Sequence, residues 1–301
     1  MQNENRGRNR LMENVPKKVI VAGLGLIGGS MAKAVKEHTD CRVLGWNRTR
    51  SVAEKALEEG AIDGIANEED FRDCDLLMPV LYPQATISFL LEKIPQMKKG
   101  ALAVDLVGIK SALADAVVPA AQRCGVHYVG GHPMAGKPKT GFERSSGALF
   151  DGANMVLVPT DASTPEDLEM LQAFFLSLGF GYIKLCSAKE HDLMIAHTSQ
   201  LAHIVSNSYV KSPVSAHYVG FTGGSYKDMT RVAGIDEVVW SELFLLNSEA
   251  LLPEIDALIA NISRVRYAIE ANDRPLLEYL LQEGRKAKES IDAANPNQPS
   301  D

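Results

Sequence analysis

The sequence predicts an α/β protein in which a sheet-containing N-terminal part is followed by an all-helical C-terminal part. Three observations lead to this fold class. Short, nearly continuous apolar runs alternate with amphipathic segments from about residue 17 to residue 185, a pattern typical of a parallel sheet with helices on both faces. A glycine-rich loop follows the first apolar run. After residue 187 strand-like runs become rare and helical periodicity dominates.

The individual elements follow from apolar periodicity and from the residues that interrupt it. The predicted strands are the apolar runs at 17–24, 41–47, 75–82, 100–107, 126–131, 153–160 and 182–186. The predicted helices of the N-terminal part are 27–38, 51–59 and 163–178, the last with a capping pattern at Ser163, Thr164 and Glu166. The predicted helices of the C-terminal part are 190–205, 238–251, 253–271 and 275–288.

The chain has 301 residues, which at roughly 150 residues per domain is enough for two domains. We expect the sheet domain over residues 16–187 and the helical domain over residues 188–292. The polar stretch 1–15 has no apolar segment typical of a secretion signal. We therefore expect flexible tails at 1–15 and at 293–301.

Composition excludes several classes of protein. The net charge of −7 argues against nucleic acid as a partner, because non-specific binding to phosphates needs concentrated positive charge. No apolar run reaches the roughly 18 residues of a membrane helix, so no membrane partner is expected. The four cysteines stand at 41, 74, 124 and 186, without metal-binding or redox spacing. We expect free thiols, no bound metal and a cytoplasmic protein.

The glycine-rich loop has the spacing G-x-G-x-x-G, with Gly23, Gly25 and Gly28. It follows a predicted strand and opens a predicted helix, which is the context that a dinucleotide-binding loop requires. Gly23 allows the tight turn, Gly25 lets a pyrophosphate approach the backbone, and Gly28 lets helix and strand pack closely. Leu26 and Ile27 begin the helix, where free N–H groups favour an anion. The sequence therefore predicts a Rossmann-type dinucleotide-binding domain.

The end of the second predicted strand should contact the adenosine ribose of that cofactor. The residues there are Asn47, Arg48, Thr49 and Arg50, without the carboxylate that is typical of NAD sites. Arginine can bind a 2′-phosphate through two hydrogen bonds, whereas a carboxylate would repel it. The sequence favours NADP as the cofactor, with NAD as the alternative. A solvated helix start formed by the two arginines is the other interpretation.

His132 is the strongest candidate for acid–base chemistry among the histidines. It follows two glycines and precedes Pro133, directly after a predicted strand at the sheet edge where open α/β folds place their ligands. His191, His197 and His203 fall on one predicted helix, but their spacing of six residues does not form a metal-binding face. His203 shares a helix face with Ser199, four residues earlier. His191 has two possible interpretations, a functional residue or a polar residue at the start of the helix, and both stay open.

Over about residues 17–290 the chain resembles the prephenate/arogenate dehydrogenase family of tyrosine biosynthesis. The motifs that carry the resemblance are GLGLIGGS at 23–30, D-x-x-x-x-K at 105–110, GGHPMAGKPKTG at 130–141, His-Asp at 191–192, SQLAH at 199–203 and YKDMTRVAG at 226–234. The third and the last of these are highly specific in combination, whereas many families share the glycine loop. The resemblance implies a two-domain dehydrogenase with a small-molecule substrate.

The implied reaction is the oxidative decarboxylation of a cyclohexadienyl substrate, with hydride transfer to a nicotinamide. By resemblance, His132 is the base for the ring hydroxyl and Arg231 binds a substrate carboxylate. His203, Ser199 and Lys110 are further substrate contacts implied by the same motifs. Two alternatives stay open here: Arg231 could pair with Asp228 within a helix, and Lys110 could be a helix-start lysine or a phosphate contact.

The chain departs from the family pattern at two positions. Many members carry a serine where this chain has Gly108, so that Ser111, a backbone N–H or a water must replace its hydroxyl, or His132 works alone. Many members also have a histidine where this chain has Gln200. No residue plainly supplies a carboxylate for the amino group of arogenate, so the choice between prephenate and arogenate stays open.

Two other functions fit parts of the sequence. A β-hydroxyacid-type dehydrogenase would need a catalytic lysine on the helix after residue 187, where Lys189 stands at the very start. A non-catalytic NADP-binding regulator would bind the cofactor without turnover. The helical domain is apolar on more than one face, for example at 243–246, 251–252, 276–277 and 280–281. We expect a homodimer through these helices, or otherwise a single thick bundle.

Overall fold

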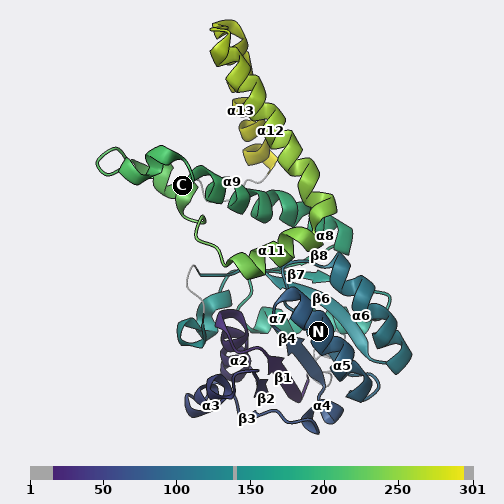
Figure 1. Ribbon diagram of the computed structural model, residues 1–301. Helices are drawn as coiled ribbons and strands as arrows, with labels where there is room; N and C mark the ends of the chain where they lie inside the picture. Colours follow the sequence, from purple (N-terminus) through teal and green to yellow (C-terminus); the bar gives the residue numbers. More distant parts are fainter. Residues whose placement is uncertain (1–15, 138–140, 295–301) are drawn as a thin grey trace, which may run out of the picture. The chain divides into compact units, whose positions relative to one another are not determined.

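The computed structural model describes residues 16–137 and 141–294, and Figure 1 shows the arrangement of their elements. Contacts between residues divide the chain into two compact units, one that ends at Ser248 and one that begins at Glu249. The first unit contains the whole sheet and the helices that cover it. The second unit contains two long helices.

The first unit is built on one sheet of eight strands in the order β3-β2-β1-β4-β5-β6-β7-β8. The strands are β1 (Lys18–Ala22), β2 (Arg42–Trp46), β3 (Gly64–Ile65), β4 (Leu76–Pro79), β5 (Leu102–Asp105), β6 (His127–Pro133), β7 (Asn154–Val158) and β8 (Tyr182–Leu185). The order doubles back at β1, which pairs with β2 on one side and with β4 on the other. Ligands of open α/β sheets bind beyond the carboxyl ends of the strands at such a point.

The direction of the last two strands differs from the expectation of an all-parallel sheet. Strands β1 to β6 pair in parallel, but β6 and β7 are antiparallel, with His132 opposite Val156. Strand β8 then pairs in parallel with β7. An apolar run has the same pattern in either direction, so periodicity alone could not show this reversal. The predicted fold class, a Rossmann-type α/β domain followed by helices, is confirmed.

Helices and short turns connect and follow the strands. The α-helices of the sheet region are α2 (Leu26–His38), α3 (Arg50–Glu58), α4 (Asp70–Asp73), α5 (Pro83–Lys93), α6 (Ser111–Cys124) and α7 (Pro165–Ser177). The later ones are α8 (Ala188–Ile195), α9 (Ala202–Tyr209), α10 (Gly224–Thr230), α11 (Glu237–Leu246), α12 (Ser248–Glu270) and α13 (Arg274–Ala294). Shorter helical turns are η1 (Ile94–Gln96), η2 (Phe142–Arg144), η3 (Gly147–Phe150) and η5 (Pro213–His217), and η4 (Ala196–Leu201) is a π-helix.

Both faces of the sheet are buried, as the continuous apolar strands predict. Val19 and Val21 of β1 belong to one hydrophobic cluster, whereas Ile20 and Ala22 belong to the cluster on the opposite face. All four side chains are fully buried. Successive side chains of a strand point to opposite faces, so a strand buried on both sides must be apolar at every position.

The C-terminal helices begin and end differently from the expected ranges. Helix α11 ends at Leu246, and α12 begins at Ser248 and continues through Pro253, where the sequence predicted a break. Pro253 lies in the second turn of α12, which therefore lacks one backbone donor within the helix. None of the described helices is long and apolar enough to cross a membrane.

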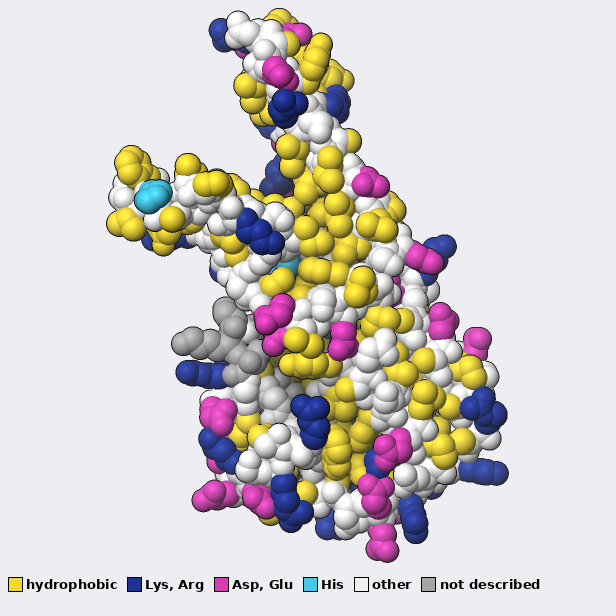
Figure 2. Space-filling model, in the orientation of Figure 1, with side chains coloured by type: hydrophobic (Ala, Val, Ile, Leu, Met, Phe, Trp, Pro, Cys, Tyr) yellow, Lys and Arg dark blue, Asp and Glu magenta, His cyan; other side chains and the backbone are white. Residues whose placement is uncertain are grey.

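Helices α12 and α13 expose large apolar side chains along much of their length, and Figure 2 shows hydrophobic side chains gathered over this region. The exposed residues are Leu252, Ile259, Ile262, Tyr267, Ile269, Tyr279, Leu281 and Ile291. Large apolar groups of adjacent helices are rarely left in water in such number unless another surface covers them.

Candidate active site

The glycine loop joins the carboxyl end of β1 to the start of α2. Gly23 has φ +97°, and a Cβ placed there would lie 2.3 Å from the carbonyl oxygen of Val80. A Cβ on Gly28 would lie 1.8 Å from the carbonyl oxygen of Gly23. The two outer glycines of the motif are therefore required by the fold itself: one by the backbone conformation and both by close packing.

Gly25 differs from its two neighbours in the motif, because a Cβ there would have no atom within 4 Å. The fold alone does not require glycine at this position. Helix α2 begins at Leu26 without a side-chain cap, so the first N–H groups of a long helix face outward beside Gly25. Open space over glycine next to an uncapped helix start fits the pyrophosphate of a dinucleotide.

The end of β2 supports the glycine loop and exposes a cation. The Asn47 amide oxygen accepts a hydrogen bond from the Leu24 N–H at 3.0 Å, and its nitrogen donates to the Thr49 carbonyl at 3.0 Å. The Arg50 guanidinium pairs with Glu54 at 2.9 Å on the surface of α3. Arg48 is exposed at the same strand end. Asn47 thus holds the loop in place. Of the two arginines at this strand end, Arg50 has a carboxylate partner, whereas Arg48 has none among the contacts of the described residues.

A cavity of about 670 Å³ lies beyond the end of β6, and His132 is one of its walls. His132 is partly buried within the last residues of this strand, between Gly131 and Pro133, rather than after it. The cavity is lined by Gly108, His132, Pro133, Met134, Ala135, Gly136, Lys137, Ile195, Thr198, Ser199, Gln200, His203, Arg231, Val232, Gly234, Ile235, Asp236, Val239, Trp240 and Leu243. The expected site residues His132, Ser199, His203 and Arg231 therefore share one cavity. Residues 138–140 of the GGHPMAGKPKTG motif lie outside the described residues.

The helix that carries Ser199 and His203 is not a regular α-helix. The π-helix η4 lies between α8 and α9, where the sequence predicted one helix over 190–205. A π-helical turn holds one extra residue, so it rotates the following side chains relative to an α-helix, and such turns are frequent at functional sites. Here the turn contains Thr198, Ser199 and Gln200, all of which line the cavity.

His203 and Arg231 line the cavity from the helical part of the chain after β8. The His203 Nδ1 donates to the carbonyl oxygen of Val232 at 2.9 Å, and its ring lies 3.9 Å from that of Trp240. Burial and the nearby Arg231 lower the pKa of His203, although the bond to Val232 opposes the shift. Neutral His203 thus offers Nε2 as an acceptor. No ion pair joins Arg231 to Asp228 among the contacts of the described residues, so the guanidinium is available to an anion.

Lys110 does not line the cavity, because its ammonium group is buried behind β6. Its Nζ donates to the Asp105 carboxylate and to the carbonyl oxygen of Gly131, and the side chain is 1% exposed. The Tyr128 hydroxyl donates to the same carboxylate at 2.7 Å. Burial lowers the pKa of Lys110 while Asp105 raises it. Lys110 was expected to contact the substrate. In the structure its ammonium group instead holds the carbonyl of Gly131, the residue before His132.

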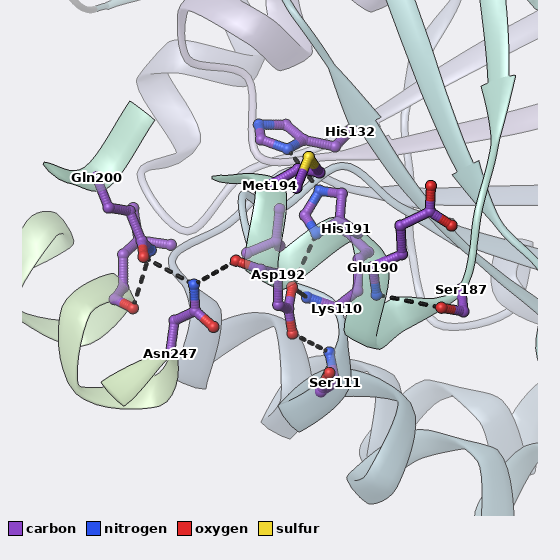
Figure 3. A network of polar contacts seen from close by, with 12 residues as sticks. Lys110, Ser111, His132, Ser187, Glu190, His191, Asp192, Met194, Gln200 and Asn247 are labelled. Atoms are coloured by element: carbon purple, nitrogen blue, oxygen red, sulfur yellow. Dashed lines mark hydrogen bonds and ion pairs between the residues drawn. The ribbon is translucent and has the colours of Figure 1, made fainter. Parts of the chain in front are cut away.

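His132 contacts a second histidine, which in turn contacts a carboxylate (Figure 3). The His132 Nδ1 lies 2.9 Å from the His191 Nε2, and the His191 Nδ1 lies 2.8 Å from an oxygen of Asp192. The Asp192 oxygens also accept the backbone N–H groups of Lys110 and Ser111 at 2.8 Å each. The start of α6 and the start of α8 thus meet at one carboxylate behind the catalytic candidate.

Burial sets the protonation of this group of side chains. Burial, His191 and Lys110 all lower the pKa of His132, and burial is the largest cause. Burial also lowers the pKa of His191, against the opposing effect of Asp192. Burial alone would raise the pKa of Asp192, but hydrogen bonds from His191, Ser111 and the backbone lower it. At neutral pH the group therefore consists of two neutral imidazoles and a carboxylate.

Gln200 and Asn247 fasten helix α11 to the same part of the site. The Asn247 amide donates to the Gln200 side-chain oxygen at 2.7 Å and to the backbone oxygen of Asp192 at 2.9 Å. Gln200 also donates to the carbonyl oxygen of Leu243 at 3.2 Å. Both polar ends of Gln200 are therefore used within the protein, which explains an amide at this position.

Position 108 leaves space in front of the histidine. A Cβ on Gly108 would lie 3.7 Å from the His132 Nε2 and 3.5 Å from a methyl carbon of Leu243. Ser111 is not among the residues of the cavity, because it begins α6 at Asp192. Among the described residues, the one side chain that is hydrogen-bonded to the His132 ring is therefore His191, on the side away from the cavity.

Sequence reasoning missed part of this site. It left His191 open, and it gave no role to Asp192, Trp240 or Asn247. The adjacent His191-Asp192 pair was the available signal, since an imidazole beside a carboxylate at a helix start is an unusual polar pair to bury. Across 16–137 and 141–294, no three His, Cys, Asp or Glu side chains are grouped so that they could hold a metal ion.

The fold and the site together define a nicotinamide-dependent dehydrogenase: a nucleotide-binding loop, a neutral imidazole and a cation meet at one edge of a Rossmann-type sheet. The family model of the prephenate dehydrogenase nucleotide-binding domain matches residues 31–184, and that of the prephenate dehydrogenase dimerization domain matches residues 187–283. The chain therefore belongs to the prephenate dehydrogenase family.

Individual relatives agree with the family. The prephenate dehydrogenase of Lactococcus lactis is 29% identical over 92% of this chain and 78% of its own length. The structure of prephenate dehydrogenase from A. aeolicus, in complex with hydroxyphenyl propionate and NAD+, has a TM-score of 0.80 at 25% identity and covers 92% of this chain and 98% of that one. The structure of Synechocystis arogenate dehydrogenase has a TM-score of 0.76 at 26% identity, over 91% of this chain and 99% of that one.

Substitution of the glycines distinguishes a ligand-facing position from a packing position. We expect Gly25→Ala to fold normally and to bind the dinucleotide about 10- to 100-fold more weakly, because its methyl group meets no protein atom but blocks the pyrophosphate. Gly28→Ala should lower the free energy of unfolding by about 1–3 kcal/mol through overpacking. Thermal unfolding and cofactor titration measure both effects. A Gly25→Ala protein with unchanged affinity would contradict the assignment of the loop.

Proposed function

We propose that this protein catalyses the oxidative decarboxylation of prephenate or arogenate, with NADP as the hydride acceptor, in tyrosine biosynthesis. The observation that carries the proposal is the placement of the His132 Nε2 and Arg231 in one cavity at the carboxyl edge of a dinucleotide-binding sheet. The family membership of the chain supports the reaction type. NADP rather than NAD rests on the exposed Arg48 at the end of β2.

The cofactor is held by the glycine loop and the strand end beside it. Gly23, Gly25 and Gly28 shape the turn, and the N–H groups of Leu26 and Ile27 bind the pyrophosphate. Arg48, with Thr49 and Arg50, binds the 2′-phosphate, while Asn47 fixes the loop through Leu24. When bound, the nicotinamide accepts the hydride that leaves the ring carbon bearing the hydroxyl group.

His132 acts as the base for the ring hydroxyl. Its Nε2 accepts the hydroxyl proton as the hydride leaves, so the carbon–oxygen bond becomes a carbonyl. The carboxylate on the opposite ring carbon then leaves as carbon dioxide, and its bonding electrons make the ring aromatic and the oxygen a phenolate. The protonated His132 returns its proton to that oxygen, which restores the neutral base. The lowered pKa of His132 keeps it unprotonated before each turnover.

The cations of the cavity bind a substrate that carries two carboxylates. Arg231 can hold one of them through two parallel hydrogen bonds. Lys137, which also lines the cavity, gives the second carboxylate a partner. Ser199 and His203 contribute neutral polar contacts from η4 and α9, because the His203 pKa is lowered. Lys110 acts from behind the strand by holding the Gly131 carbonyl.

The alternative of a β-hydroxyacid-type dehydrogenase has less support in the geometry. Such an enzyme would need a lysine in the position of the acid and base, but Lys189 is an exposed residue at the start of α8 and does not line the cavity. A non-catalytic NADP-binding regulator would have no use for an imidazole held at the base of the cavity. Absorbance of the reduced nicotinamide with prephenate and with arogenate tests both alternatives.

We further propose a cytoplasmic homodimer formed through the helices after residue 187. The exposed apolar side chains of α12 and α13 support it, as does the match to a dimerization domain. All four cysteines are free thiols, which fits a reducing compartment.

Removal of the imidazole tests the role of His132. We expect His132→Asn to lower kcat by about 10²–10⁴-fold, as is usual for loss of a general base, with cofactor affinity nearly unchanged. His38→Asn, on the exposed last turn of α2, is the control and should keep full activity. Steady-state kinetics with both candidate substrates measures the effect. Turnover close to that of the unaltered protein would show that His132 is not the base.

Removal of the guanidinium tests carboxylate binding. We expect Arg231→Ala to raise KM by about 10- to 100-fold with a smaller change in kcat, because it removes a charge-assisted contact made before and during the reaction. Lys227→Ala, on α10 but outside the cavity, is the matched control. An unchanged KM for Arg231→Ala would give this residue a structural role instead.

Charge reversal at the end of β2 tests the cofactor preference. We expect Arg48→Asp to lower the ratio of kcat/KM for NADP to that for NAD by about 100-fold, because the 2′-phosphate loses a cation and meets an anion. Arg123→Asp, near the end of α6, controls for a general effect of surface charge. If the ratio stays the same, the interpretation of Arg48 is wrong.

A further inference from the structure

His191 and Asp192 lie behind His132 without a part in the reaction described above. The three side chains form a line from the cavity into the protein, with hydrogen bonds of 2.9 Å between the imidazoles and 2.8 Å to the carboxylate (Figure 3). His191 is 2% exposed and Asp192 is 5% exposed. A buried polar group of this kind requires a partner for each donor and acceptor.

The carboxylate determines the direction of every hydrogen bond in the line. Asp192 already accepts the N–H groups of Lys110 and Ser111, and an ionised carboxylate can only accept. The His191 Nδ1 must therefore carry the hydrogen of the bond to Asp192. Since His191 is neutral, its Nε2 has a lone pair and accepts from the His132 Nδ1. The remaining nitrogen of His132, Nε2, then has no hydrogen.

The free nitrogen is the one that faces the cavity. Gly108 lies beside Nε2 and has no side chain; even an added Cβ would be 3.7 Å from this nitrogen. The opposite arrangement would place a hydrogen on Nε2 and turn two lone pairs toward each other between the rings. That arrangement would lose a buried hydrogen bond and would leave His132 unable to accept a proton from this side.

We propose that His191, held by Asp192, is a positioning residue that fixes which nitrogen of His132 carries hydrogen and thereby keeps Nε2 free to accept the substrate proton. This inference rests on the proposed role of His132 as the base. After proton transfer, the same line of hydrogen bonds stabilises the charged His132 ring, because its Nδ1–H points toward a histidine that is polarised by Asp192. Neither His191 nor Asp192 needs to touch the substrate.

Two substitutions separate this role from simple support of the fold. In Asp192→Asn, the amide nitrogen can donate to the His191 Nδ1, which reverses both hydrogen bonds and places hydrogen on the His132 Nε2. We expect kcat to fall by about 10²–10⁴-fold, where the upper value is that seen when the carboxylate behind another catalytic histidine is replaced by an amide, with KM and cofactor affinity changed less than threefold. His191→Gln keeps an acceptor for His132, whereas His191→Leu removes it. The glutamine variant should retain a kcat at least about 10-fold above that of the leucine variant.

The chain offers a matched control at the other end of the same strand. The His127 Nδ1 lies 2.9 Å from an oxygen of Asp167, and Asp167 also caps α7 through Thr164. Asp167→Asn therefore removes a carboxylate that holds a histidine and accepts a backbone N–H at a helix start. Asp192→Asn does the same at His191 and at the start of α6. We expect a similar loss of thermal stability but an unchanged kcat.

The closing experiment is 15N NMR of the full-length protein labelled at histidine, which identifies the protonated nitrogen of each neutral imidazole. His132 is assigned by the signal that is missing in His132→Asn. We expect the hydrogen on Nδ1 in the unaltered protein and on Nε2 in Asp192→Asn. Hydrogen on the His132 Nε2 of the unaltered protein, or equal kcat values for the glutamine and leucine variants, would overturn the proposal. Absence of turnover with prephenate and arogenate would refute the proposed function, whereas the NMR result decides the positioning independently of activity.

Discussion

The carboxylate of Asp192 is the interaction on which the arrangement of the site depends. It accepts the first N–H groups of α6 and the ring of His191, so it joins the helix after β5 to the helix after β8. Lys110 and Asp192, which are 82 positions apart in the sequence, are thereby held within hydrogen-bonding distance. Three hydrogen-bond donors take the place of water around Asp192. The carboxylate therefore remains ionised although it is almost fully buried, and its pKa is lowered. The ring of His191, and through it the ring of His132, is oriented by this anion.

A second buried charge fixes the strand from the other direction. Lys110 spans from the start of α6 to Asp105 and to the Gly131 carbonyl, directly before His132. Burial of an ion pair seldom adds stability by itself, since desolvation offsets most of the attraction. The ion pair between Lys110 and Asp105 instead fixes the position of the backbone that carries the His132 imidazole. The same cation also lowers the pKa of His132, after burial and His191. One lysine therefore both fixes the backbone before His132 and adds to the lowering of the pKa of its ring.

Local signals in the sequence were enough to predict the fold class, the place of the glycine loop between the first strand and its helix, and the place of His132 at the sheet edge. Each of them depends on neighbouring residues: apolar runs predict strands, G-x-G-x-x-G requires a particular turn, and Pro133 and two glycines mark a rigid strand end. The features that the sequence did not predict depend on tertiary contacts. An apolar run does not encode the direction of β7, and no residue pattern revealed that η4 is a π-helix. The ring of His191 meets that of His132 across 59 residues of sequence, which helical periodicity cannot show.

The line of hydrogen bonds also gives a physical account of glycine at position 108. A general base needs one nitrogen held by a donor or acceptor of the protein and the other left free for the substrate. In this chain the orientation of the ring is set from behind by His191 and Asp192, so the front can remain open. The space at Gly108 and the buried carboxylate therefore act together: the glycine leaves room beside the His132 Nε2, and the carboxylate fixes the ring from the other side through His191.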